Sequence, residues 1–153
     1  MTDNKDSTQT IKEHITDVQL VMTWVHVKLR SRMRHHDESK LREPEKSLYD
    51  EWIPKLRELD YASDEYKTAL EQMGPALQHH YKHNSHHPEH YENGIAGMSL
   101  LDLIEMYCDW VAAILSKGGD VSTGIQINVK RYGIDEQLAS ILANTQAELR
   151  FEE

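Results

Sequence analysis

The sequence predicts an all-α fold, a single-domain helical bundle over residues 1–153. Apolar residues recur every three or four positions through most of the chain, which is the period of an amphipathic helix. Gly, Pro and capping residues interrupt this pattern where helices should end. The length of 153 residues suits one domain with a single core. We expect a core that carries the motifs over about 9–117 and a C-terminal helical extension over about 122–149.

The first two predicted helices lie in the N-terminal third of the chain. The first spans about residues 9–35, where the apolar residues at helical spacing are Ile11, Ile15, Val18, Met22, Val25, Leu29 and Met33. The second spans about residues 44–59. Pro44 is tolerable in its first turn, whereas Pro54 predicts a kink or a break.

A third helix is predicted over about residues 64–83, because Ser63 is a good N-cap and acidic residues follow it. Gly74 and Pro75 should disturb this helix. Residues 84–98 are predicted to form a loop, since they contain Pro88 and the stretch ENGIAG. Ser99 should cap the next helix, which presents a broad apolar surface and ends at the glycine pair 118–119.

The stretch IQINVKRYG, residues 125–133, could form a short helix or a strand. Its β-branched residues in a brief apolar run leave the period ambiguous, and we favour a helix. Asp135 then opens a final helix that runs to about residue 149. Every predicted element is therefore helical.

Composition excludes several classes of protein. The net charge of −9, from 26 acidic and 17 basic residues, argues against a nucleic acid polymer as partner. No apolar run approaches the roughly 18 residues that a membrane helix needs. Nothing in MTDNKDSTQT marks the chain for secretion, so we expect a cytoplasmic protein without a membrane partner. Assembly into a homo-oligomer stays open.

The segment RHHDESK, residues 34–40, is the first candidate for a functional site. His36 and Asp37 together offer one imidazole nitrogen and one carboxylate oxygen, a pairing that suits divalent metal ions such as Mn, Fe, Co or Zn. Lys40 could reach a phosphate held on that metal. The alternative interpretation is an exposed helix end with mixed charge.

The segment HHYKHNSHHPEHY, residues 79–91, is the second candidate and holds six of the ten histidines. His79, His83 and His87 are each four residues apart, so a continuing helix would place a row of imidazoles on one face. Pro88 fixes the backbone directly after His86 and His87. The alternative is a solvated surface that binds metal adventitiously.

The segment EMYCDW, residues 105–110, is the third candidate. Glu105 and Asp109 lie four residues apart in the most apolar predicted helix, where a bare carboxylate would cost several kcal/mol unless something neutralises it. A salt bridge is the ordinary explanation and a metal ion is the other. An upstream ligand could come from His14, with His26 as its competitor. A straight helix would hold His14 about 33 Å from His36, so these two share a metal only if the chain turns back.

The order of these motifs resembles the HD superfamily of metal-dependent phosphohydrolases, with a histidine on an early helix, then His-Asp, then a late aspartate. HHDESK resembles the His-Asp-x-x-Lys pattern of that superfamily. HHPEHYENG is similar to the His-His-Glu segment of its cyclic-dinucleotide phosphodiesterase branch. Residues 14–110 also resemble a family of uncharacterised phage and bacterial proteins with His-Asp-x-Ser-Lys, Asn-x-His-His and Glu-Met-x-x-Asp-Trp segments.

The resemblance implies an HD-like fold and roles for particular residues. The metal ligands that it implies are His14, His36, Asp37 and Asp109, with His86 and His87 as further ligands or phosphate contacts. The other roles are catalytic. Asp37 would bridge or orient, Lys40 would sit on the phosphate, and His79 or His80 would protonate the leaving oxygen. Glu105 would hold a ligand histidine in its tautomer.

The implied activity is hydrolysis of a phosphate ester or anhydride of a small nucleotide, rather than a cyclic dinucleotide or a polymer. One or two divalent ions (Mn, Fe, Co, Zn or Mg) would activate the water. Four aromatic residues near the motifs could stack on a base or simply pack: Tyr81, Tyr91, Tyr107 and Trp110. The rival hypotheses are a non-catalytic metal-binding protein, either structural or a phage-type inhibitor that sequesters a nucleotide, and a helical interaction domain with surface histidines.

Overall fold

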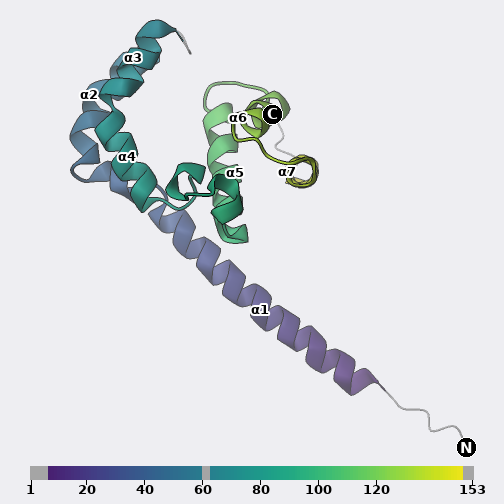
Figure 1. The fold of residues 1–153 in the computed structure, drawn as a ribbon. Helices are drawn as coiled ribbons and strands as arrows, with labels where there is room; N and C mark the ends of the chain where they lie inside the picture. The colour runs from purple at the N-terminus through teal and green to yellow at the C-terminus, as the bar shows by residue number, and fades with distance from the viewer. Residues whose placement is uncertain (1–6, 60–62, 150–153) are drawn as a thin grey trace, which may run out of the picture. The chain divides into compact units, whose positions relative to one another are not determined.

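The computed structural model describes residues 7–59 and 63–149 (Figure 1). All regular structure within these residues is helical, which confirms the predicted all-α class. Contacts divide the chain into two compact units, residues 1–35 and residues 36–153. Within the described ranges, no helix combines the length and the apolar character that a membrane span requires.

The first unit contains one helix, α1 (Thr8–His35), which confirms the helix predicted over 9–35. It runs unbroken for 28 residues, and none of its side chains is buried. Its large apolar side chains are exposed at positions that include Ile11, Ile15, Val18, Met22 and Val25. This helix therefore has the apolar pattern of a packed helix without a covered face.

The second unit begins with a short 3-10 turn, η1 (Glu38–Leu41), followed by α2 (Glu45–Glu58). Of the kink or break predicted at Pro54, the break is wrong, because α2 continues through this residue. Pro54 cannot donate to the carbonyl of Asp50 one turn earlier. Both residues are exposed, so water can satisfy that carbonyl.

The single helix predicted over 64–83 is in fact two helices, α3 (Asp64–Gln72) and α4 (Gly74–His83). Met73 separates them, and Pro75 lies in the first turn of α4, where its missing N–H costs nothing. Three small or flexible apolar side chains are buried where α2, α3 and α4 meet: Ala69, Met73 and Ala76. The disturbance expected at Gly74 and Pro75 is thus a new helix start.

The predicted loop over 84–98 contains two short 3-10 turns, η2 (Pro88–His90) and η3 (Gly94–Gly97). Helix α5 (Leu100–Leu115) follows, and Ser99 caps it as expected. The Ser99 hydroxyl accepts a hydrogen bond from the Asp102 amide at 3.2 Å, and the Asp102 carboxylate accepts one from the Ser99 amide at 2.8 Å. This reciprocal pair is a capping box that fixes the start of α5.

The ambiguous stretch 125–133 lies mainly in a helix, α6 (Val121–Arg131), and α7 (Glu136–Leu149) confirms the final helix. The main apolar core lies among α5, α6 and α7, and its buried members are Met106, Tyr107, Trp110, Val111, Val121, Ile125 and Leu142. Within this core, Trp110 stacks on Tyr132 with ring centroids 5.5 Å apart and the planes 6° from parallel. This packing holds α5 as a rigid support for the residues on its other face.

Candidate metal centre

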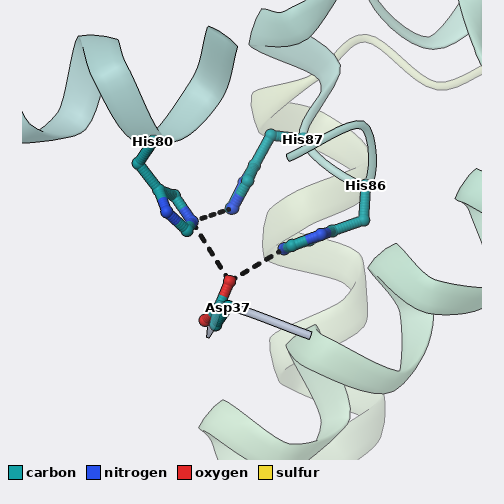
Figure 2. Close-up of side chains that lie close together, drawn as sticks. All are labelled: Asp37, His80, His86 and His87. Atoms are coloured by element: carbon teal, nitrogen blue, oxygen red, sulfur yellow. Dashed lines mark hydrogen bonds and ion pairs between the residues drawn. The ribbon is translucent and has the colours of Figure 1, made fainter. Parts of the chain in front are cut away.

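Four side chains from three chain segments converge in the second unit (Figure 2). Asp37 precedes η1, His80 lies in α4, and His86 and His87 lie in the loop that follows α4. Asp37 Oδ1 lies 3.2 Å from His80 Nε2 and 3.4 Å from His86 Nε2. His80 Nε2 lies 2.9 Å from His87 Nε2. One oxygen and three imidazole nitrogens therefore surround a common point.

The spacing of these donor atoms fits a metal ion. Ligands bound at about 2.0–2.1 Å lie about 3.0–3.4 Å from one another in octahedral or tetrahedral coordination, close to the separations just given. Asp37 Oδ1 and His86 Nε2 are buried, and neither forms a hydrogen bond of acceptable geometry within residues 7–59 and 63–149. Buried polar atoms without partners are costly. A cation held between them would remove this cost.

Two acidic residues hold the histidines in the orientation that ligation needs. Glu45 Oε2 lies 3.0 Å from His80 Nδ1. Glu105 Oε1 lies 3.0 Å from His36 Nδ1 and 3.3 Å from His86 Nδ1. A carboxylate at Nδ1 fixes the proton there and leaves Nε2 with its lone pair. The Nε2 atoms of His80 and His86 face Asp37 as a result.

A second group of donors adjoins the first through Asp37. His36 Nε2 lies 3.5 Å from Asp37 Oδ2 and 3.6 Å from Asp109 Oδ1. His36, Asp37 and Asp109 therefore form a further set that could hold an ion, and so do His36, His86 and Glu105. Because Asp37 belongs to two of these sets with different oxygens, the centre has the donors for one ion or for two that share this carboxylate.

Asp37 is held in an unusual conformation. Its backbone has φ of 57°, in the left-handed region that non-glycine residues other than Asn and Asp rarely adopt. Lys40 Nζ donates to Asp37 Oδ2 at 2.5 Å, which leaves Oδ1 directed at the histidines (Figure 2). The chain thus turns sharply at Asp37. One oxygen of its carboxylate, Oδ1, faces His80 and His86, and the other, Oδ2, faces His36.

Buried hydrogen bonds also fix the loop that carries His86 and His87. The Asp102 carboxylate, near the start of α5, accepts hydrogen bonds from Ser85 Oγ at 2.7 Å and from Tyr91 OH at 2.9 Å. The Asn84 amide donates to Ser39 Oγ at 2.8 Å. The loop is therefore tied to η1 through Asn84 and to α5 through Ser85 and Tyr91, so the two histidines between these contacts are placed by the fold.

Charge is unevenly distributed over the centre. Hydrogen bonds with Asp109 and Glu105 raise the pKa of His36 to about 10, so without an ion its ring carries a positive charge that offsets the carboxylates around it. An ion bound at His36 Nε2 would displace that proton. Burial works to raise the pKa of Asp37, but contacts with His80 and Lys40 hold it well below its usual range. Burial, with His86 and His80 nearby, lowers the pKa of His87 to about 3. His87 is therefore neutral, the form in which an imidazole binds metal.

The upstream ligand expected at His14 requires a correction. Sharing a metal with His36 requires the chain to turn back between them, and α1 is unbroken from Thr8 to His35. Along this helix, His14 lies about 32 Å from His35, and the competitor His26 lies about 14 Å from it. Neither can join His36 and Asp37 at one ion within a single chain.

The row of imidazoles on one helix face is also not formed. Helix α4 ends at His83, and the chain reverses so that His87 meets His80 from the other side. His79 lies outside the donor groups: its Nδ1 is 2.7 Å from Glu45 Oε1, and its ring stacks on His83 with centroids 4.0 Å apart. His80, expected as a proton donor, instead lies among the potential ligands and is only 1% exposed.

A family model described as a family of unknown function, DUF5662, matches residues 3–149 of the chain. The chain belongs to the DUF5662 family. No curated protein and no solved structure matches it.

Sequence reasoning missed the residue that supports His79 and His80 in this DUF5662 protein. Glu45 is fully buried, and besides the two imidazoles it accepts a hydrogen bond from Ser39 Oγ at 3.0 Å. The sequence offers no signal for it, because a glutamate in the first turn of a helix is ordinarily a solvated residue that favours the helix dipole. Ser39 and Asn84 lie in the His-Asp-x-Ser-Lys and Asn-x-His-His segments, but no role at the centre was predicted for either.

A cavity of about 510 Å³ lies between α5 and α6 of the DUF5662 protein and borders the centre at His87 and Asp109. Of the four aromatic residues considered for base stacking, Tyr81 and Trp110 line this cavity. Tyr107 is buried in the core, and Tyr91 is bonded to Asp102. Lys40 is absent from the cavity lining. Another cavity of similar volume, between α2 and α3, is lined by residues outside the donor groups.

Proposed function

We propose that this DUF5662 protein is a metal-dependent phosphohydrolase of the HD type that acts on a small nucleotide in the cytoplasm. One observation carries the proposal. Asp37 Oδ1 and the Nε2 atoms of three histidines converge, and two of these four atoms are buried without a hydrogen bond in the described part of the chain. Imidazole and carboxylate donors together favour Mn, Fe, Co or Zn, and Mg is a weaker candidate.

The residues that would hold the ions are His80, His86, His87 and Asp37 for one ion, with His36 and Asp109 for a second. When bound, divalent ions would supply Lewis acidity to a phosphoryl group and to the attacking water. The cavity that ends at His87 and Asp109 gives a substrate access to this point. An accessible coordination position distinguishes a catalytic metal site from a closed structural one.

The chain's own residues would orient and balance the centre. Glu45 and Glu105 keep the ligand imidazoles in the tautomer with a free Nε2. Lys40 neutralises part of the charge on Asp37 and fixes which oxygen faces the histidines. These contacts would hold the donors in place before any ion or substrate arrives, which is the arrangement that efficient catalysis requires.

A non-catalytic metal protein, structural or nucleotide-sequestering, is the second candidate. Three histidines and one aspartate make a complete set of four ligands, the number that a closed structural zinc site uses. The additional donors His36 and Asp109 beside the cavity favour catalysis over this alternative.

The test is metal content followed by a turnover screen. Protein purified without a histidine tag should contain stoichiometric divalent metal, and it should release phosphate from at least one small nucleotide when supplied with Mn, Co, Mg or Zn. Metal should be measured by plasma mass spectrometry and phosphate by colorimetry. Stoichiometric metal without turnover would favour the second candidate, whereas protein that binds none of these metals would contradict both.

A further inference from the structure

The cavity between α5 and α6 has a defined direction relative to the metal centre. The two helices are joined by a short turn after Leu115, and Tyr132, just beyond α6, stacks on Trp110 of α5. The C-terminal end of α6 therefore lies beside Asp109, and the start of α6 lies toward Lys117. Arg131, the last residue of α6, lines the cavity at the end that borders the centre.

Arg131 is well suited to receive a phosphate at this place. Its guanidinium carbon lies 4.9 Å from the centroid of the Tyr132 ring, and its Nη2 atom lies 3.6 Å from Glu89 Oε1. Tyr132 OH donates to the same Glu89 oxygen at 3.1 Å. The planar fork of an arginine can bind two phosphate oxygens at once. Lys40, in contrast, does not line the cavity.

The rest of the cavity suits a flat organic group with a polar edge. Trp110, Ile114 and Ile127 supply apolar wall surface. Asn128 also lines the cavity and is half-buried, and its carboxamide forms no hydrogen bond with the residues that the structure describes. A carboxamide can both donate and accept, so it can recognise the edge of a ring that carries both kinds of group. The volume of about 510 Å³ lies within the range of pockets for a single small ligand.

We infer that this cavity is the substrate-binding site, with the phosphoryl group between the metal centre and Arg131 and the organic group along α5 and α6 as far as Asn128. The inference rests on the proposed function and extends it to the residues that bind and select the substrate. Arg131 binds the phosphate and offsets its negative charge, and the Asn128 carboxamide recognises the edge of the ring. Lys130 is the matched control, since it precedes Arg131 on the same helix, is exposed, and does not line the cavity.

Isothermal titration of the Mn-loaded full chain tests this assignment with two kinds of probe, inorganic phosphate and the four common nucleoside 5′-monophosphates. Arg131→Gln should weaken binding of both kinds by about 10- to 100-fold, the effect of losing a charge-assisted pair of hydrogen bonds. Asn128→Ala should weaken the binding of the nucleotides about 10-fold and leave the binding of inorganic phosphate unchanged. Lys130→Gln should change neither, and all three variants should keep the wild-type metal content.

Unchanged binding in Arg131→Gln, or equal weakening in Lys130→Gln, would overturn the cavity assignment. So would a wild-type protein that holds metal and hydrolyses a nucleotide yet binds neither kind of probe, and in that case the proposed function would stand. Wild-type protein that binds no metal would overturn the proposed function, and the cavity assignment with it.

Helix α1 carries a second, independent inference. Its apolar residues alternate in steps of four and three, which is the heptad spacing of a coiled-coil seam: Ile11, Ile15, Val18, Met22, Val25 and Leu29. The helix has 28 residues, the length of four heptads, which is enough for a sustained coiled coil. Of the six seam residues, five are between 41% and 66% exposed, and Leu29 is partly buried.

A second copy of this helix fits the seam. The exposed seam side chains present on the order of 500 Å² per helix, so pairing two helices would remove about 1,000 Å² from water, the area that a specific interface needs. In a parallel pair, the flanking contacts would be His14 with Gln19, Val21 with His26 and Lys28 with Met33, none of which joins like full charges. We propose that α1 pairs with α1 of a second chain to form a homodimer.

Two valines on α1 provide a matched test. Val18 lies in the seam, whereas Val27 lies on the opposite side of the same helix and is 57% exposed. In sedimentation velocity at about 50 µM, a concentration well above a micromolar Kd, the wild-type chain should have the mass of two chains. Val18→Glu should have the mass of one chain, and Val27→Glu should keep the mass of two. A monomeric wild type, or a Val27→Glu chain that dissociates like Val18→Glu, would overturn the proposal.

Discussion

Asp37→Asn should abolish metal-dependent phosphate release and weaken metal binding by more than about 100-fold, beyond the effect of losing a supporting residue. The aspartate contributes an oxygen to two donor groups, and the substitution removes the negative charge while keeping the shape of the side chain. Metal content by mass spectrometry and phosphate release by colorimetry measure the two effects. Full turnover in this variant would contradict the assignment of Asp37.

The backbone at this position decides which substitution is informative. With φ of 57°, an alanine would be strained, whereas asparagine readily adopts this conformation. The helical content of Asp37→Asn, measured by circular dichroism, should therefore match that of the wild type. Asp50→Asn is the matched control, because Asp50 is exposed on α2 and pairs only with Lys46 among the described residues, at 2.6 Å. It should retain metal and turnover.

Glu45→Gln should weaken metal binding by about 10- to 100-fold and lower the free energy of unfolding by about 2 kcal/mol. Glutamine offers one acceptor oxygen where the carboxylate offers two, so His79 and His80 can no longer both donate to it. Without a carboxylate at Nδ1, the proton of the imidazole is no longer fixed there, so the lone pair of Nε2 is less available to a metal ion. Titration calorimetry and urea denaturation measure the two quantities.

The control for Glu45 lies on the same helix, less than two turns further along. Glu51 is exposed and accepts a hydrogen bond from Lys55 at 2.8 Å. An exposed pair of this kind contributes less than about 1 kcal/mol. Glu51→Gln should therefore leave metal affinity unchanged. Equal effects of the two substitutions would show that Glu45 acts through general stability rather than through the histidines.

Periodicity predicted the helices, and the reasons for its failures are local. The apolar spacing of α1 and the N-cap at Ser99 were sufficient to place α1 and α5. The break at Pro54 did not occur, and the carbonyl that lacks a donor there belongs to an exposed residue that water can reach. The division at Met73 is a matter of tertiary packing, since its side chain is 2% exposed between two helices.

The candidate centre was predicted in part for a related reason. His36, Asp37, His86, His87, Glu105 and Asp109 come together as their motifs suggested. The position of His80 could not be foreseen, because it depends on the reversal of the chain after His83. Spacing within one helix says nothing about contacts made after such a reversal. The prediction for His14 failed for the opposite reason. It required the chain to turn back between His14 and His36, and α1 continues without a break to His35.

The small apolar core gives the donor cluster a further importance. His80, His86 and Glu45 are among the largest fully buried side chains, alongside Met73 and Met106. The centre also joins residues far apart in the chain, since His36 and Glu105 are 69 residues apart. An ion bound there would act as a removable cross-link. Because the ligands come together only in the folded chain, the free energy of binding the ion would add to the free energy of unfolding, so chelation would destabilise the fold.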